Sequence, residues 1–171
     1  TGELGYLFEY RIGATGDFTA LPGGAITLTD FSRFQFDGGL GIFPPSSVVY
    51  LRIRATRTAS PTTTAYSNEV SVTMPPLTAP TLLGANVFSE NSVQLNWTDN
   101  SNNEDAFLVQ IRLLPSGNFA NAAVASANAT TFNLTLAHLP YPGKSYEIRV
   151  VAANESGLSL VTSDPTNTVT V

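Results

Sequence analysis

The sequence predicts an all-β protein, and three observations support this fold class. Apolar and polar residues alternate over stretches of about four to eight positions, whereas the period of an amphipathic helix is hard to find. Clusters of Gly, Pro, Asn and Asp separate these stretches, at intervals of roughly ten residues. Hydrophobic residues make up 43% of the chain and charged residues only 12%, about half of the usual share. This combination is typical of a turn-rich β-sandwich or barrel.

The first part of the chain contains three expected strands. Alternation over residues 6–11 places aromatic side chains on one face of the first strand, namely Tyr6, Phe8 and Tyr10. The same pattern predicts strands at residues 49–56 and 69–73. Residues 21–24 (LPGG) and 38–41 (GGLG) are interpreted as turns, because neither lies between a strand and a helix as a phosphate-binding loop does.

The second part contains the remaining expected strands, one of which carries the only tryptophan. In that strand Val93, Leu95 and Trp97 alternate with Gln94 and Asn96. The other strands are expected at residues 107–113, 131–135, 146–153 and 168–171.

The two parts of the chain repeat each other in sequence. Residues 2–11 and 16–18 match residues 103–112 and 117–119 at an offset of 101. Further matches pair residues 45–55 with 142–152 at an offset of 97, and residues 67–73 with 166–171 at an offset of 99. Three prolines in residues 74–80 (MPPLTAP) mark a linker. We therefore expect two copies of one domain, at residues 1–76 and 77–171.

Composition excludes several classes of chemistry. The chain has no Cys and a single His, so thiol catalysis, disulfides, Cys-based zinc sites and multi-histidine metal sites are excluded. The formal net charge of -5 offers no basic surface for nucleic acid or anionic lipid. No apolar run approaches the roughly 18 residues that a membrane span needs. We therefore expect neither nucleic-acid binding nor membrane insertion.

The second copy resembles a bacterial fibronectin type III domain over residues 78–171. Two stretches carry the resemblance: APTLLGANVFSENSVQLNWTDN with Pro80, Leu83 and Trp97, and YEIRVVAANESGLS together with the preceding HLPYPGKSY. The resemblance implies two immunoglobulin-like β-sandwiches in tandem, the first of them incomplete. It also implies that Trp97 fills the core and that the hydroxyl of Tyr146 bonds to the loop before it. Both residues are expected to be structural.

The first copy departs from this pattern in two ways. Val49 stands at the position of the tyrosine, and the copy begins at its third strand, so the first two strands have no counterpart. The inner face would then lose most of its covering sheet and expose several hundred Å² of apolar surface. That face is expected to consist of Tyr6, Phe8, Tyr10, Val49, Leu51 and Ile53.

Three sources of cover are open at this point. Some cover is internal if the aromatic set of the first copy packs there, namely Phe31, Phe34, Phe36 and Phe43. Otherwise the missing strands come from an upstream segment or from a neighbouring chain by strand addition. Residues 78–101 are needed by the second copy, so a closed swap between identical chains cannot complete both. We expect the natural polypeptide to be longer at its N-terminus, with a smaller, divergent first sandwich as the alternative.

No constellation of residues predicts a catalytic, cofactor or metal site. His138 lies in a loop without a nucleophile motif, which favours a surface or turn histidine. The segment Asp99–Asp105 (DNSNNED) offers alternating side-chain oxygens to a calcium ion. It lacks the glycine of a calcium loop, and Gln110 replaces the closing glutamate. Backbone-bonded turns are therefore favoured, with calcium left open.

Other patterns have structural explanations beside functional ones. The four phenylalanines of the first copy could bind sugar rings only if their side chains are exposed rather than packed in the core. Arg52 and Arg54 are expected on the outer sheet face near Tyr50, stacking on its ring. Sequons permit glycosylation without arguing for it, at Asn96, Asn128, Asn133 and Asn154. No Arg-Gly-Asp motif is present, so integrin binding of that kind has no support.

These observations predict a non-catalytic, extracellular or cell-surface module, structural or adhesive, within a longer surface protein or filament. We expect no cofactor, and protein–protein contacts through the uncovered first copy. The alternative is a carbohydrate-binding or spacer domain of a secreted polysaccharide-degrading enzyme, with a polysaccharide as partner. Fold resemblance alone does not choose between them.

Overall fold

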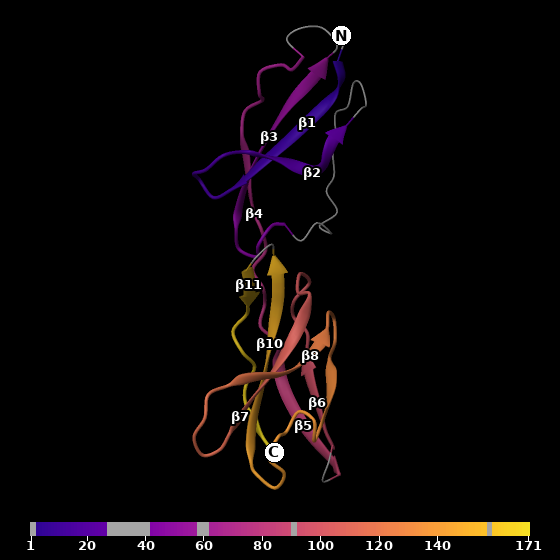
Figure 1. Cartoon of the computed structure of the whole chain (residues 1–171), viewed down its shortest axis with the longest axis vertical. Coiled ribbons are helices and arrows are strands. Elements are labelled where there is room, and N and C mark those ends of the chain that lie inside the picture. Colours follow the sequence, from indigo (N-terminus) through magenta and orange to yellow (C-terminus); the bar gives the residue numbers. More distant parts are fainter. Residues whose placement is uncertain (1–2, 27–41, 58–61, 90–91, 157–158) are drawn as a thin grey trace. The chain divides into compact units, whose positions relative to one another are not determined.

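The computed structural model describes residues 3–26, 42–57, 62–89, 92–156 and 159–171. The chain divides into two compact units, Thr1–Pro75 and Pro76–Val171 (Figure 1). Every regular element within the described ranges is a strand, which confirms the all-β prediction. In those ranges no helix is long and apolar enough to cross a membrane. The division between the units falls one residue before the boundary expected from the sequence.

The first unit contains a four-stranded antiparallel sheet in the order β2-β1-β3-β4. Its strands are β1 (Glu3–Ile12), β2 (Thr19–Ile26), β3 (Val48–Arg57) and β4 (Val70–Thr73).

Strand β2 was not expected, and the interpretation of residues 21–24 as a turn is wrong. Pro22 and two glycines lie inside β2, where the register with β1 shifts between Leu7 and Glu9. A Cβ on Gly24 would lie 2.8 Å from the Cβ of Leu21, so this irregular strand requires glycine there. The second stretch interpreted as a turn, residues 38–41, lies outside the described residues.

The second unit contains two sheets. One has five strands, with the order β11-β10-β7-β8 and with β12 also paired to β10, and the other has three, in the order β5-β6-β9. The first is built from β7 (Ala106–Leu113), β8 (Ala120–Ser126), β10 (Tyr146–Ser156), β11 (Ser159–Thr162) and β12 (Val169–Thr170). The second is built from β5 (Thr81–Ser89), β6 (Ser92–Thr98) and β9 (Thr131–Thr135).

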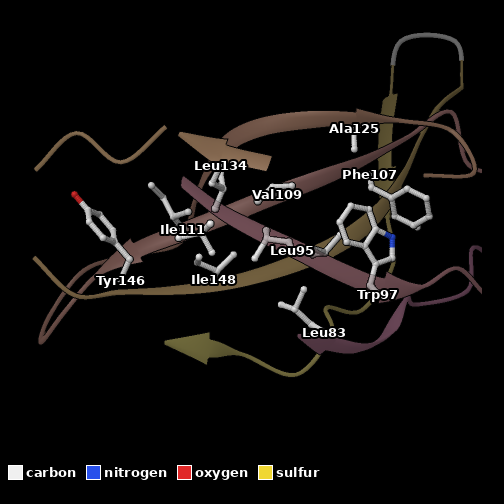
Figure 2. Packing of buried hydrophobic residues seen from close by; sticks show 13 residues of the cluster. Leu83, Leu95, Trp97, Phe107, Val109, Ile111, Ala125, Leu134, Tyr146 and Ile148 are labelled. Carbon is white, nitrogen blue, oxygen red and sulfur yellow. The ribbon is translucent and has the colours of Figure 1, made fainter. Parts of the chain in front are cut away.

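The core of the second unit lies between these two sheets (Figure 2). The ring of Trp97 on β6 packs against Phe107 on β7, with 5.5 Å between their centroids. Leu95 and Leu134 from the smaller sheet and Ile148 from the larger are fully buried. Trp97 is therefore a core residue, as the sequence predicts.

Tyr146 makes the hydroxyl bond expected of it. Its ring is buried at the start of β10, and its Oη accepts a hydrogen bond of 2.8 Å from the main-chain N–H of Tyr141. The same hydroxyl lies 3.3 Å from the carbonyl oxygen of Tyr141, to which it donates. The loop before β10 is thereby fixed to the sandwich. At the corresponding position of the first unit, Val49 is fully buried and supplies no hydroxyl.

The central strands of both units pair in equivalent registers. In the first unit β1 faces β3 with the pairs Tyr6–Ala55, Phe8–Ile53, Tyr10–Leu51 and Ile12–Val49. In the second unit β7 faces β10 with the pairs Phe107–Ala152, Val109–Val150, Ile111–Ile148 and Leu113–Tyr146. Each residue pair of the first unit corresponds to a pair of the second unit at the offsets of the sequence repeat, which are 101 from β1 to β7 and 97 from β3 to β10.

Hydroxyl residues bond to the main chain of β3 in the first unit and of β10 in the second unit in the same way. The N–H of Ser67 donates to the carbonyl of Ile53 at 2.8 Å, and its Oγ accepts from the N–H of Ile53 at 3.1 Å. Thr166 makes both bonds with Val150, at 2.9 and 3.0 Å. A further equivalent pair of braces joins Thr64 to Ala55 and Ser163 to Ala152.

We expect Tyr146→Phe to lower the free energy of unfolding by about 1 to 2 kcal/mol, because it leaves the Tyr141 amide without its acceptor. Urea denaturation followed by Trp97 fluorescence measures the change. Tyr141→Phe is the matched control, because the ring of Tyr141 is exposed and only its main-chain N–H takes part in the bond. This substitution should change the free energy of unfolding by no more than about 0.5 kcal/mol. Equal effects of the two variants would contradict this role of the hydroxyl.

Candidate functional site

The first unit carries an apolar sheet face. Side chains directly opposite each other in antiparallel strands share a face, so the registers of β1, β3 and β4 place six apolar residues together. We call this set the apolar face: Phe8, Tyr10, Leu51, Ile53, Val70 and Val72. Phe8, Tyr10, Leu51 and Ile53 are half-buried, while Val70 and Val72 are exposed, Val70 at 55%.

The equivalent face of the second unit is covered. Val109, Ile148 and Val150 are fully buried beneath the β5-β6-β9 sheet, and Val169 and Val171 are packed against the same core. Within the described part of the first unit, only Leu21 and Val49 are buried hydrophobic residues. The same strand pattern therefore gives a filled core in one unit and a partly open face in the other.

A hollow of about 290 Å³ opens on this face. It is lined by Phe8, Leu51, Arg52, Ile53, Ser67, Asn68 and Val70. The guanidinium of Arg52 is bonded to Glu9, a residue of the outer face, at 2.9 and 2.7 Å. Among the described residues that line the hollow, those whose side chains face it are therefore uncharged.

The aromatic set predicted as cover or as sugar platform is described in part. The ring of Phe43 meets that of Tyr10 edge-on, with 5.2 Å between centroids, which makes Phe43 a packing residue of the apolar face. Phe31, Phe34 and Phe36 lie outside the described residues.

The outer face of the first unit holds a ladder of arginines and aromatic rings. Arg52 lies over Phe18 at 3.9 Å and over Tyr66 at 3.6 Å from the ring centroids. Arg54 lies 4.8 Å from the centroid of Tyr66, whereas Tyr50 stacks with Arg11. Stacking on the outer face is as expected, but the ring assigned to Arg52 and Arg54 is wrong. Tyr66 replaces Tyr50 because it folds back over β3, where its hydroxyl donates to Glu9 at 3.1 Å.

The second unit repeats this arrangement. Phe119 lies beneath both Arg112 and Arg149, at 4.9 and 4.0 Å, as Phe18 lies beneath Arg11 and Arg52. Stacking of guanidinium groups on rings stabilises each sheet without any ligand. The ladder is therefore part of the fold in both units.

His138 has a structural environment. Its Nδ1 accepts a hydrogen bond of 3.0 Å from the N–H of Thr135, and its ring packs edge-on against Phe132. The imidazole closes the turn after β9, in agreement with the interpretation as a turn histidine.

Side-chain oxygens of Asp99, Asn103 and Asp105 accept hydrogen bonds within the protein. Asp99 accepts from the N–H of Ser101 at 2.9 Å, and the Ser101 hydroxyl donates to Asn103 at 3.0 Å. Asp105 reaches β10, where it accepts from the N–H of Glu155 at 2.7 Å. These are the backbone-bonded turns that the sequence favours. Within the described ranges, no three His, Cys, Asp or Glu residues are grouped to hold a metal ion.

The four sequons differ in their environment. Asn96, Asn128 and Asn133 are exposed. Asn154 is half-buried, and its Nδ2 donates to the carbonyl of Asn103 at 2.7 Å.

Comparison with solved structures finds one that matches nearly the whole chain at a TM-score of 0.50. The chain is similar to the FN1–FN3 domains of chicken CNTN1, with a TM-score of 0.50, 16% identity and coverage of 98% of this chain and 54% of that chain. This chain thus spans about half the length of that structure, and at such identity the likeness shows the fold alone. A segment of two fibronectin type III domains from chicken tenascin has a TM-score of 0.49, 16% identity and coverage of 98% and 83%.

A third structure, titin kinase with its flanking domains, has a TM-score of 0.41 and 20% identity, and the match covers 54% of this chain and 17% of that chain. The comparison with curated proteins found no match. The family model of the fibronectin type III domain matches residues 78–169, which form nearly all of the second unit. Since this match spans more than half of the chain and the two sheets enclose a single core, the protein belongs to the fibronectin type III family.

Proposed function

We propose that the protein is a non-catalytic structural or adhesive module of a longer extracellular or cell-surface protein or filament. Fibronectin type III domains typically serve as structural and adhesive modules. The observation that carries the proposal is the apolar face of the first unit, whose equivalents in the second unit are buried under a second sheet. An apolar surface of this kind marks a site of protein contact.

The first unit is, in this proposal, a bacterial-type fibronectin type III sandwich in tandem with the second and lacking its first two strands. The equivalent strand registers support this, because they reproduce the sequence offsets pair by pair. The equivalent hydroxyl braces support it independently, since Ser67 and Thr166 bond the same position of their partner strands. The proposed domain boundary, between residues 76 and 77, lies one residue after the division between the compact units.

The missing strands come from outside the first unit, either upstream or from a neighbouring chain. Within the described residues the matching strands are β5 and β6, which contribute Leu83, Leu95 and Trp97 to the core of the second unit. Removing them would leave that core uncovered. The face therefore serves for protein–protein contact by strand addition.

We expect electron microscopy of the native material to show fibres or ordered surface assemblies. Strand addition joins one chain to the next when the donor is a neighbour, so the contact propagates. Isolated particles whose mass equals that of a single chain would contradict assembly through the apolar face.

The contact surface itself can be tested by replacing Val70 and Val72 with Asp in the full chain. Both valines are exposed, so the fold should persist by circular dichroism. The double substitution should lower the fluorescence of bound 8-anilinonaphthalene sulfonate severalfold relative to the wild type, because this dye binds accessible apolar surface. Val124→Asp, at an equally exposed valine of the second unit, is the matched control. Unchanged dye binding by the double variant would exclude the apolar face as the accessible surface.

The alternative function is an accessory carbohydrate-binding domain of a secreted polysaccharide-degrading enzyme. Two exposed rings of the second unit favour it, Phe88 at 67% and Tyr141 at 58% exposure. We expect the chain to pass unretained over insoluble cellulose, chitin and xylan. Retention that Phe88→Ala and Tyr141→Ala abolish would replace the adhesive proposal with this one.

A further inference from the structure

We propose that the edge of β8 binds a second copy of this chain. In this dimer the β8 strands of the two copies pair antiparallel across a two-fold axis, so that the larger sheets of the two second units become one continuous sheet. The contact is made by other residues than those of the apolar face. The inference therefore goes beyond the proposed function and does not depend on it.

The β8 strand has one unpaired side in the described structure. It is the last strand in the order β11-β10-β7-β8, and within the described residues it pairs with β7 alone. Residues 90–91 and 157–158 of this unit are not described, but each of these links joins strands that already pair with each other, at Ser89–Ser92 and Ser156–Ser159. An edge strand presents main-chain N–H and C=O groups to a strand that approaches it.

Most other edge strands in the described ranges have features that hinder such pairing. The register of β5 with β6 shifts twice, and β4, β11 and β12 contain only four, four and two residues. Strand β2 corresponds to β8 at the repeat offset of 101, yet it contains Pro22 and two glycines. Two edges are regular, namely β8 over Ala123–Ser126 and β9 over Thr131–Thr135.

No charged side chain hinders pairing at these two edges. The sequence has no Asp, Glu, Lys or Arg between Arg112 and Lys144, a stretch that contains all of β8 and β9. Charged side chains, lysine above all, are a usual means by which edge strands avoid pairing. The chain has a net charge of -5, so two copies repel each other least where neither carries charge. A partner of opposite charge would find no counter-charge here, which favours a second copy.

An apolar side chain favours β8 over β9. The exposed residues of β9 are polar, whereas β8 exposes Val124 at 62%. The registers place Val124 opposite Leu108 of β7, and Leu108 opposite Val151 of β10. These residues share the outer face of the sheet, where Leu108 and Val151 are buried. The apolar row thus ends at the edge with an uncovered valine.

A two-fold axis at Val124 lets the second copy cover that valine. The axis sets Val124 opposite its own counterpart, and it sets Ala123 opposite Ala125 of the second copy. The side chain of Ala125 points into the core (Figure 2), so the small residues of β8 leave the edge open to close approach. The apolar row then continues from one copy into the next.

Sedimentation of the full chain over a series of concentrations tests the dimer. We expect a dimer that Val124→Lys weakens about tenfold or more, because the axis sets the two introduced charges opposite each other. Val87→Lys, at a similarly exposed valine of β5, is the matched control and should dimerise like the wild type. Asn133→Lys on β9 should do so as well. All three variants should remain folded by circular dichroism, since each replaces an exposed side chain.

A cysteine variant tests the position of the axis. The chain contains no cysteine, so Val124→Cys introduces a single thiol. Oxidation with copper phenanthroline should link two copies through this thiol, because opposite residues of antiparallel strands bring their Cβ atoms within about 5 Å. Val87→Cys should cross-link severalfold more slowly.

Four results would overturn the inference. One is a wild-type chain that stays monomeric up to about 1 mM. Another is a dimer that persists in Val124→Lys; its loss in the double variant of Val70 and Val72 would then assign assembly to the apolar face and leave the proposed function intact. A third is loss of the dimer in Asn133→Lys instead, which would place the contact at β9. The fourth is equal cross-linking by the two cysteine variants.

Discussion

A β-sheet with one apolar face must be covered by a second layer, and this constraint explains the difference between the two units. Alternation places the side chains of β7 and β10 on one face, where the β5-β6-β9 sheet buries Val109, Ile148 and Val150 completely. The same alternation in β1 and β3 produces a face with the same register. Its members Leu51 and Ile53 remain half-buried within the described structure. The pairing of the central strands creates the apolar face in both units, and the β5-β6-β9 sheet buries it in the second.

The sheets are stabilised by interactions that do not depend on the covering layer. Hydroxyl braces such as that of Ser67 on Ile53 bond main-chain groups within one sheet. On the opposite face of each sheet, one phenylalanine ring stacks with two arginines: Phe18 in the first unit and Phe119 in the second. These features recur in both units, so a sheet of this kind keeps its register while its inner face stays available. That combination suits a unit completed by a strand from elsewhere.

Much of this architecture could be predicted from the sequence, because alternation fixes which residues share a face and the repeat fixes which strands pair. The role of Trp97 and the hydroxyl bond of Tyr146 also follow from sequence motifs. Strand β2 could not be predicted, since Pro22 and its glycines resemble a turn until the bulge is seen. The alanine-rich β8 has no alternation.

The central proposal is that the apolar face of the first unit is a protein-contact surface that an extended strand completes. An experimentally determined structure of the protein in its native assembly tests it most directly. The account predicts a strand across β1, β3 and β4 that does not belong to residues 1–171, with an aliphatic side chain in the hollow. An assembly in which Val70 and Val72 both face water would contradict the account.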